Sequence, residues 1–160
     1  MLNEPAPLEN KLPPPIRAIL AHTGKRRSFL RDEPVRNVNR RGVPGIQMAV
    51  NLTSYRSLPL SCIEGLLLKI DGQETDVSAA ILLLNGHEHP LSDLSGLSHL
   101  WWFILDPGTF FVPLPQELTP GSHHFEATLI TVEPYITAGR FSFYHADRRD
   151  LTVEARENGQ

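Results

Sequence analysis

The chain has 160 residues and a mass of 17.9 kDa, a length typical of one domain, with 41% hydrophobic and 21% charged residues. A domain of this size buries roughly two-thirds of its unfolded surface, so it can hold a substantial core. The net charge of −3 and the pI of about 6.1 argue against nucleic acid or an anionic membrane as partner, because both require a concentrated basic face.

Residues 1–25 differ from the rest of the chain because they are rich in proline, including the triplet Pro13–Pro15. Proline favours an extended chain and removes backbone donors. We therefore expect an N-terminal extension at 1–25, one β-domain at 26–156 and a tail at 157–160. A basic cluster ends this arm, and we interpret it as a solvated surface: Lys25, Arg26, Arg27 and Arg31.

From residue 28 onward, apolar and polar residues alternate with the period of two that marks β-strands. The strands predicted for the first half cover residues 28–38 (interrupted at Pro34), 46–53, 65–70 and 80–84. Asp71-Gly72 and Asn85-Gly86 are dipeptides typical of two-residue hairpin turns. The first of these turns is expected to lead towards the strand at 80–84.

The second half continues the pattern. Strands are predicted at 99–105, at 109–112, in a long segment that opens after Pro120-Gly121, and near 151–154. One helical turn is expected at 92–97, capped by Ser92 or Asp93. Short strands, regular turns and little helix predict an all-β fold, specifically an antiparallel β-sandwich of the jelly-roll or immunoglobulin-like type.

The segment Gly-His-Glu-His-Pro at 86–90 is the clearest metal candidate, because His87 and His89 would share one face of a strand. A cupin-like metalloenzyme would need a nearby downstream glutamate, and none follows in the next seven residues, Pro90–Gly96. Two histidines alone are an incomplete ligand set. We therefore predict no metal site on this chain.

Other polar groups offer no complete catalytic set. His123 and His124 are adjacent on a strand and face opposite ways, so we expect one to be core-facing and the other solvated. The run at 144–150 is interpreted as an exposed loop with compensating charges. Cys62, the single cysteine, is interpreted as a small buried hydrophobe and not as a nucleophile.

The N-terminus lacks the pattern of a secretory signal, and no apolar run is long enough to cross a bilayer. A single cysteine excludes an internal disulfide. These features favour a cytoplasmic protein.

The pair Tyr55-Arg56 precedes the predicted strand at 65–70. It is either the polar rim of a strand edge or a contact for another molecule. Tyrosine offers rigid area with a polar tip and arginine a planar fork of donors, and both are enriched in interfaces. We interpret Tyr55 and Arg56 as facing a partner or covering its active site, with no catalytic role.

Several segments in order resemble the β subunit of bacterial C-glycoside deglycosidases, over about residues 36–153. The most specific is Tyr-Arg-x-x-Pro-Leu-Ser-x-Ile-Glu at Tyr55–Glu64, which leads to Ile-Asp-Gly at Ile70–Gly72. A weaker one is Leu-x-Pro-Gly-x-His at Leu118–His123.

The resemblance implies a small non-catalytic subunit in a hetero-oligomer with a (β/α)-barrel α subunit similar to sugar-phosphate isomerases. The α subunit would hold a divalent metal, expected to be manganese, and the acid–base residues. The complex would cleave the carbon–carbon bond between a 3-oxo-glucosyl group and an aromatic aglycone, such as a flavonoid. It implies no cofactor on this chain.

Two alternatives stay open at this point. The chain could be a carbohydrate-binding module with an exposed aromatic platform, for which Trp101 and Trp102 are the candidates. Because neighbours alternate along a strand, at least one of the two tryptophans should point into the core. The other alternative is the cupin-like metalloenzyme built on His87 and His89.

Overall fold

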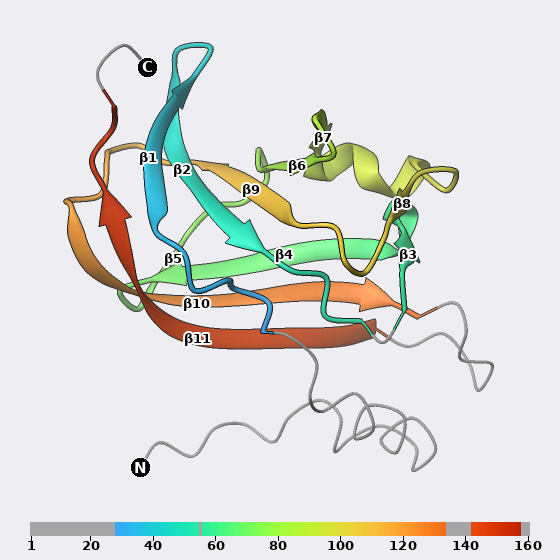
Figure 1. Ribbon diagram of the computed structural model, residues 1–160. Helices are drawn as coiled ribbons and strands as arrows, with labels where there is room; N and C mark the ends of the chain where they lie inside the picture. Colours follow the sequence, from blue (N-terminus) through green and yellow to red (C-terminus); the bar gives the residue numbers. More distant parts are fainter. Residues whose placement is uncertain (1–27, 55, 134–141, 158–160) are drawn as a thin grey trace, which may run out of the picture.

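The computed structural model describes residues 28–54, 56–133 and 142–157 (Figure 1). The expected extension at 1–25 lies outside these residues. Within the described ranges, nine strands form one sheet in the order β5-β4-β10-β11-β1-β2-β9-β6-β7, and β3 and β8 form a separate pair. The strands are β1 (Val35–Arg40), β2 (Val43–Val50), β3 (Leu58–Pro59), β4 (Ile63–Ile70), β5 (Gln73–Glu74), β6 (Ile81–Leu84), β7 (His87–Pro90), β8 (Trp101–Trp102), β9 (Gly108–Pro113), β10 (Gly121–Val132) and β11 (Ser142–Glu154).

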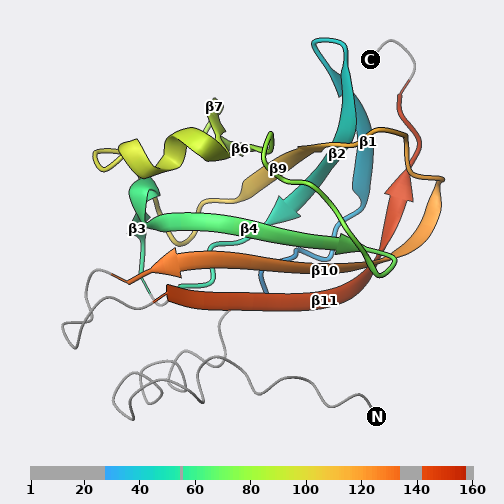
Figure 2. The same cartoon turned by 180° about the vertical axis from the view of Figure 1, so that it is seen from behind.

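The predicted all-β class is confirmed, but the two-sheet antiparallel sandwich is not. The nine strands are hydrogen-bonded continuously, and β1 runs parallel to β11, with Val35 opposite Val153. Figures 1 and 2 show that β11 bends along its length, so that its C-terminal end lies beside β1. One layer is thus formed by β4, β10 and β11, and it is turned over against β2, β9 and β6. The core lies inside this curl and takes side chains from both layers.

Inward-facing and outward-facing side chains alternate along the long strands, and the inward-facing ones form this core. On β10, Phe125, Ala127 and Leu129 are buried. Leu66 and Leu68 are likewise buried on the neighbouring strand β4. Because successive side chains of a strand point to opposite faces, the intervening residues face outward.

Three hairpin turns share one backbone geometry. Both predicted turns, Asp71-Gly72 and Asn85-Gly86, have positive φ at both central residues, the type I′ pattern. A third turn, Arg41-Gly42, joins β1 to β2 with φ of 52° and 83°. This turn was not predicted from the sequence, because arginine is not a residue that favours positive φ.

Several predicted boundaries were wrong. The first strand begins only after Pro34, and residues before it make a single bridge between Leu30 and Val50. Asp71-Gly72 leads to the two-residue β5, whereas β6 pairs with β9 and β7. The predicted strand at 99–105 is reduced to β8, because the Asp106 N–H donates to the Phe103 carbonyl and turns the chain.

Two further expectations needed correction. The predicted helical turn is a 3-10 helix, η3 (Leu91–Gly96), with Pro90 at its N-cap position and no side-chain cap, so capping by Ser92 or Asp93 was wrong. A second one, η2 (Leu60–Cys62), leads into β4. The run at 144–150 is not a loop but the middle of β11, because all its residues pair with β10. No helix in the described part of the chain is long and apolar enough to cross a membrane.

Candidate functional site

Arg56 lies in the short connection between β2 and β3. Its side chain is exposed, and its backbone N–H lies 3.4 Å from the hydroxyl of Ser54. Ser54 is buried and its hydroxyl donates to the carboxylate of Glu133, at 2.8 and 2.9 Å from the two oxygens. Glu133 directly follows β10, so the Arg56 connection is attached to the end of that strand. Tyr55, the other residue of the predicted pair, lies outside the described residues.

Buried polar side chains gather at this end of the sheet. Among the described residues, all buried polar ones except Asn37 come from the segment after β2, the end of β10 or the start of β11: Asn51, Thr53, Ser54, Thr131, Glu133 and His145. The Thr131 hydroxyl and His145 Nε2 are 2.9 Å apart, and the Asn51 amide donates to the Ser28 carbonyl. Such buried hydrogen bonds hold a segment in one arrangement. This cluster could not be predicted from the sequence, because its members are far apart along the chain.

The β3–β8 pair forms the neighbouring corner of the molecule. Trp102 is fully buried, and its indole N–H donates to the Asp106 carbonyl at 2.9 Å. Gly108 lies against the indole ring, since a Cβ at that position would be 2.7 Å from the ring. Trp101 points the other way and is 40% exposed. The prediction that at least one of the two tryptophans faces the core is therefore confirmed.

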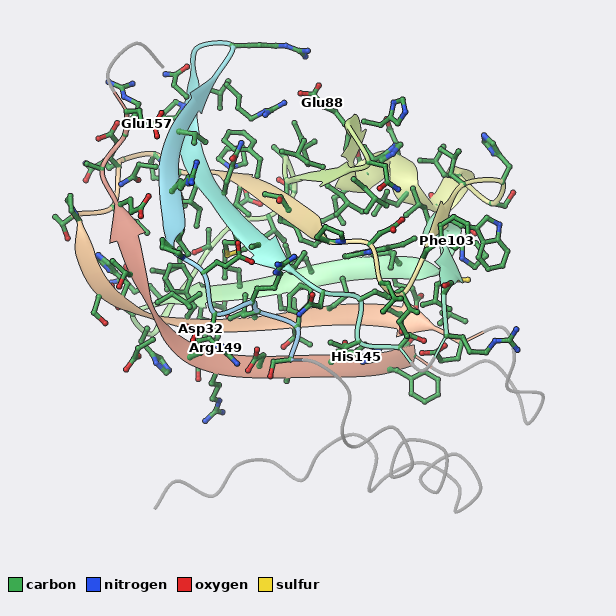
Figure 3. The ribbon with its side chains drawn as sticks, viewed as in Figure 1. Asp32, Glu88, Phe103, His145, Arg149 and Glu157 are labelled. Atoms are coloured by element: carbon green, nitrogen blue, oxygen red, sulfur yellow. The ribbon has the colours of Figure 1, made fainter. Side chains whose placement is uncertain are left out.

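The segment around Trp101 exposes a run of apolar side chains, Leu100, Trp101, Phe103 and Leu105, which we call the apolar loop. Phe103 is 57% and Leu105 78% exposed. The loop is joined to the Arg56 connection because the Ile104 N–H donates to the hydroxyl of Ser57 at 2.8 Å. Figure 3 shows Phe103 and His145 at the same end of the molecule. This end, with Arg56 and the apolar loop, is the candidate interaction surface.

His87 and His89 lie on the edge strand β7, as predicted, with ring centroids 6.3 Å apart. Burial lowers the pKa of His89, and the nearby His87 adds to the effect. Glu88, between them, forms ion pairs with Arg40 and Arg41 of the β1–β2 hairpin. Within the described residues, no three His, Cys, Asp or Glu side chains are grouped closely enough to hold a metal. Among the residues that the structure describes, His87 and His89 therefore lack the further ligands that a cupin-like enzyme needs.

His123 and His124 lie at the start of β10 and separate as predicted. His123 is largely covered: Nδ1 is 2.6 Å from the Asp71 carboxylate, and Nε2 is 2.7 Å from the Thr119 carbonyl. The hydrogen bond to Asp71 raises the pKa of His123 and lowers that of Asp71. His124 is half-exposed and lies 2.8 Å from Asp150. Two of the segments that resemble the family, Ile70–Gly72 and Leu118–His123, are thus joined by the hydrogen bond between Asp71 and His123, which has a structural role.

The remaining candidates have structural surroundings. On β11, the Arg148 guanidinium is 3.1 Å from Glu126, and the Asp147 carboxylate accepts from the Leu30 N–H. The charged residues of the run at 144–150 are therefore paired with opposite charges, as predicted, but they lie on a strand and not in a loop. Cys62 is partly buried and packs against the core. Arg31 pairs with Glu33, whereas Lys25–Arg27 lie outside the described residues.

A model of the protein family described as C-glycoside deglycosidase beta subunit matches residues 26–135 of this chain. The chain belongs to this family. A 3'-dehydrocarminate deglycosidase beta subunit from a Microbacterium species is 32% identical over 112 residues, which cover 69% of this chain and 84% of the relative. A C-glycoside deglycosidase beta subunit from Microbacterium trichothecenolyticum is 30% identical over 107 residues, 67% and 81% of the two chains. The resemblance found from the sequence is confirmed.

Proposed function

We propose that this chain is the non-catalytic subunit of a C-glycoside deglycosidase in which a (β/α)-barrel α subunit carries the acid–base residues. The observation that supports this is membership of the beta subunit family, together with relatives that are named as beta subunits. We place the hetero-oligomer in the cytoplasm. We assign the divalent metal, manganese, to the α subunit, because His87 and His89 do not form a complete ligand set with the other described residues.

The proposed substrate is a 3-oxo-glucosyl group joined through carbon to an aromatic aglycone. An aryl carbon has no lone pair for a general acid to protonate, so ordinary glycosidase chemistry is not available. A carbonyl at C3 makes the C2 proton acidic. A base can then remove that proton while C1 and C2 form a double bond, the C1–aryl bond breaks, and the aryl carbon takes up a proton. The name of the 3'-dehydrocarminate relative supports this substrate class.

In this proposal the chain covers the mouth of the barrel with the end that carries Arg56. Active sites of such barrels open at one end of the barrel, where a bound subunit can order loops and exclude water. Arg56 is exposed at this end, and its backbone is positioned by Ser54, which binds the buried Glu133. An arginine with a fixed backbone can donate to a carboxylate or carbonyl of the partner. Tyr55, its neighbour in the sequence, is assigned to the same contact.

The test is reconstitution with a C-glycoside deglycosidase α subunit. We expect each chain alone to be inactive on a 3-oxo C-glucoside, and the mixture to release the aglycone. Arg56→Ala should raise the Kd between the subunits by about thirtyfold, the effect of losing about 2 kcal/mol at a buried anchor, without changing the circular dichroism of the isolated chain. Arg36→Ala, at an exposed arginine of β1, is the control and should change the Kd by less than about threefold. If the wild-type chain neither binds the α subunit nor supports aglycone release, the proposed function is wrong.

A further inference from the structure

Large exposed apolar side chains are concentrated in one segment. Across the part of the chain that the structure describes, there are seven, and four belong to the apolar loop. The other three lie singly on separate strands: Val43 on β2, Leu67 on β4 and Tyr144 on β11. Scattered apolar residues are normal on a protein surface, whereas a contiguous group marks an interaction site.

The apolar loop is held firmly although its side chains face solvent. Its two ends are tied to the body of the protein, because the Leu60 N–H donates to the Leu100 carbonyl and the Ile104 N–H donates to the Ser57 hydroxyl. Between these bonds, the buried Trp102 fills the core beneath the loop. A surface that is already ordered loses little conformational entropy when it binds, so its apolar area is available for affinity.

The composition of this end fits a protein partner. Residues 98–105, Ser-His-Leu-Trp-Trp-Phe-Ile-Leu, contain no Lys, Arg, Asp or Glu. The centre of a protein–protein interface is depleted in charge and enriched in aromatic residues, and arginine is enriched over other cations. Arg56 lies beside the loop, because it directly precedes Ser57, whose hydroxyl holds the Ile104 N–H.

We propose that the apolar loop forms the centre of the contact with the α subunit, with Arg56 as a second anchor beside it that becomes buried on assembly. The matching surface of the α subunit is apolar at its centre and offers a carboxylate or carbonyl opposite Arg56. This inference rests on the proposed function and names the part of the chain on which assembly depends. Phe103 and Leu105 contribute most, because their side chains expose the most apolar surface and bury it on assembly.

The test compares two substitutions at positions of similar exposure. Phe103→Asp places a charge in the proposed contact, and Leu67→Asp places one on β4, where Leu67 is 53% exposed. We expect the Kd for the α subunit to rise at least about thirtyfold for Phe103→Asp and to change less than about threefold for Leu67→Asp. Leu105→Asp repeats the measurement at the most exposed of the four side chains. Thermal unfolding of each variant alone should match the wild type.

The outcomes separate this inference from the proposed function. If the wild-type chain binds the α subunit, and Phe103→Asp and Leu105→Asp bind it with the same Kd as the wild type, the apolar loop is not the contact. The proposed function then stands. If the wild-type chain does not bind, both fail. If the wild-type chain alone is a dimer in solution that Phe103→Asp dissociates, or if it binds a glucoside that the variant does not, the loop serves another occupant and the inference is overturned.

Discussion

Replacing Trp102 by alanine should be among the most damaging single changes near the candidate surface. The side chain is fully buried, so its removal leaves a cavity, and its indole N–H no longer satisfies the Asp106 carbonyl. Deletion of a buried aromatic ring costs about 3–5 kcal/mol of unfolding free energy. For a chain of 160 residues this corresponds to a fall in Tm of roughly 6–20 °C.

The assay is urea and thermal unfolding followed by circular dichroism, with Leu105→Ala as the control in the same loop. Leu105 is 78% exposed, so its truncation should cost less than about 1 kcal/mol. Trp102→Phe tests the hydrogen bond more directly, because it keeps a large ring and removes the N–H donor. A loss below about 1.5 kcal/mol for Trp102→Ala would refute the reasoning, because it would show that Trp102 does not anchor the apolar loop.

Two further predictions concern other parts of the fold. The His123–Asp71 pair should contribute its full stability above the ordinary pKa of an aspartate, 3.8, and below that of a histidine, 6.5. The contribution is lost as pH falls from there through the lowered pKa of Asp71, and as pH rises through the raised pKa of His123. In Asp71→Asn, the free energy of unfolding measured from about pH 3 to pH 9 should depend less on pH, on both the acid and the alkaline side. If its pH profile equals that of the wild type, the His123–Asp71 pair is not the source of the pH dependence. Gly45→Ala should cost about 1–3 kcal/mol, because its Cβ would lie 2.4 Å from the Val112 carbonyl oxygen, and equal Tm values for Gly45→Ala and the control Gly65→Ala would contradict this.

The sequence by itself determined the local features of this protein. Alternation along β4 and β10 shows which side chains enter the core, since the period of two is a property of the strand alone. Asp71-Gly72 and Asn85-Gly86 specify their turns through positive φ, which is also local. The separation of Trp101 from Trp102 follows from the same alternation. The segment Tyr55–Glu64 identified the family for a similar reason, because it is a continuous stretch of residue types.

Only the tertiary structure decided which of these elements meet. Periodicity states that a strand has an inner face but not which strand lies beside it, so the parallel pairing of β1 with β11 could not be predicted. Ser54 and Glu133 are 79 residues apart, and neither carries a local signal that it will be buried against the other. The apolar loop had the composition of a buried strand. It became a surface because Trp102 alone turned inward there and the chain turned at Asp106 before a longer strand could form.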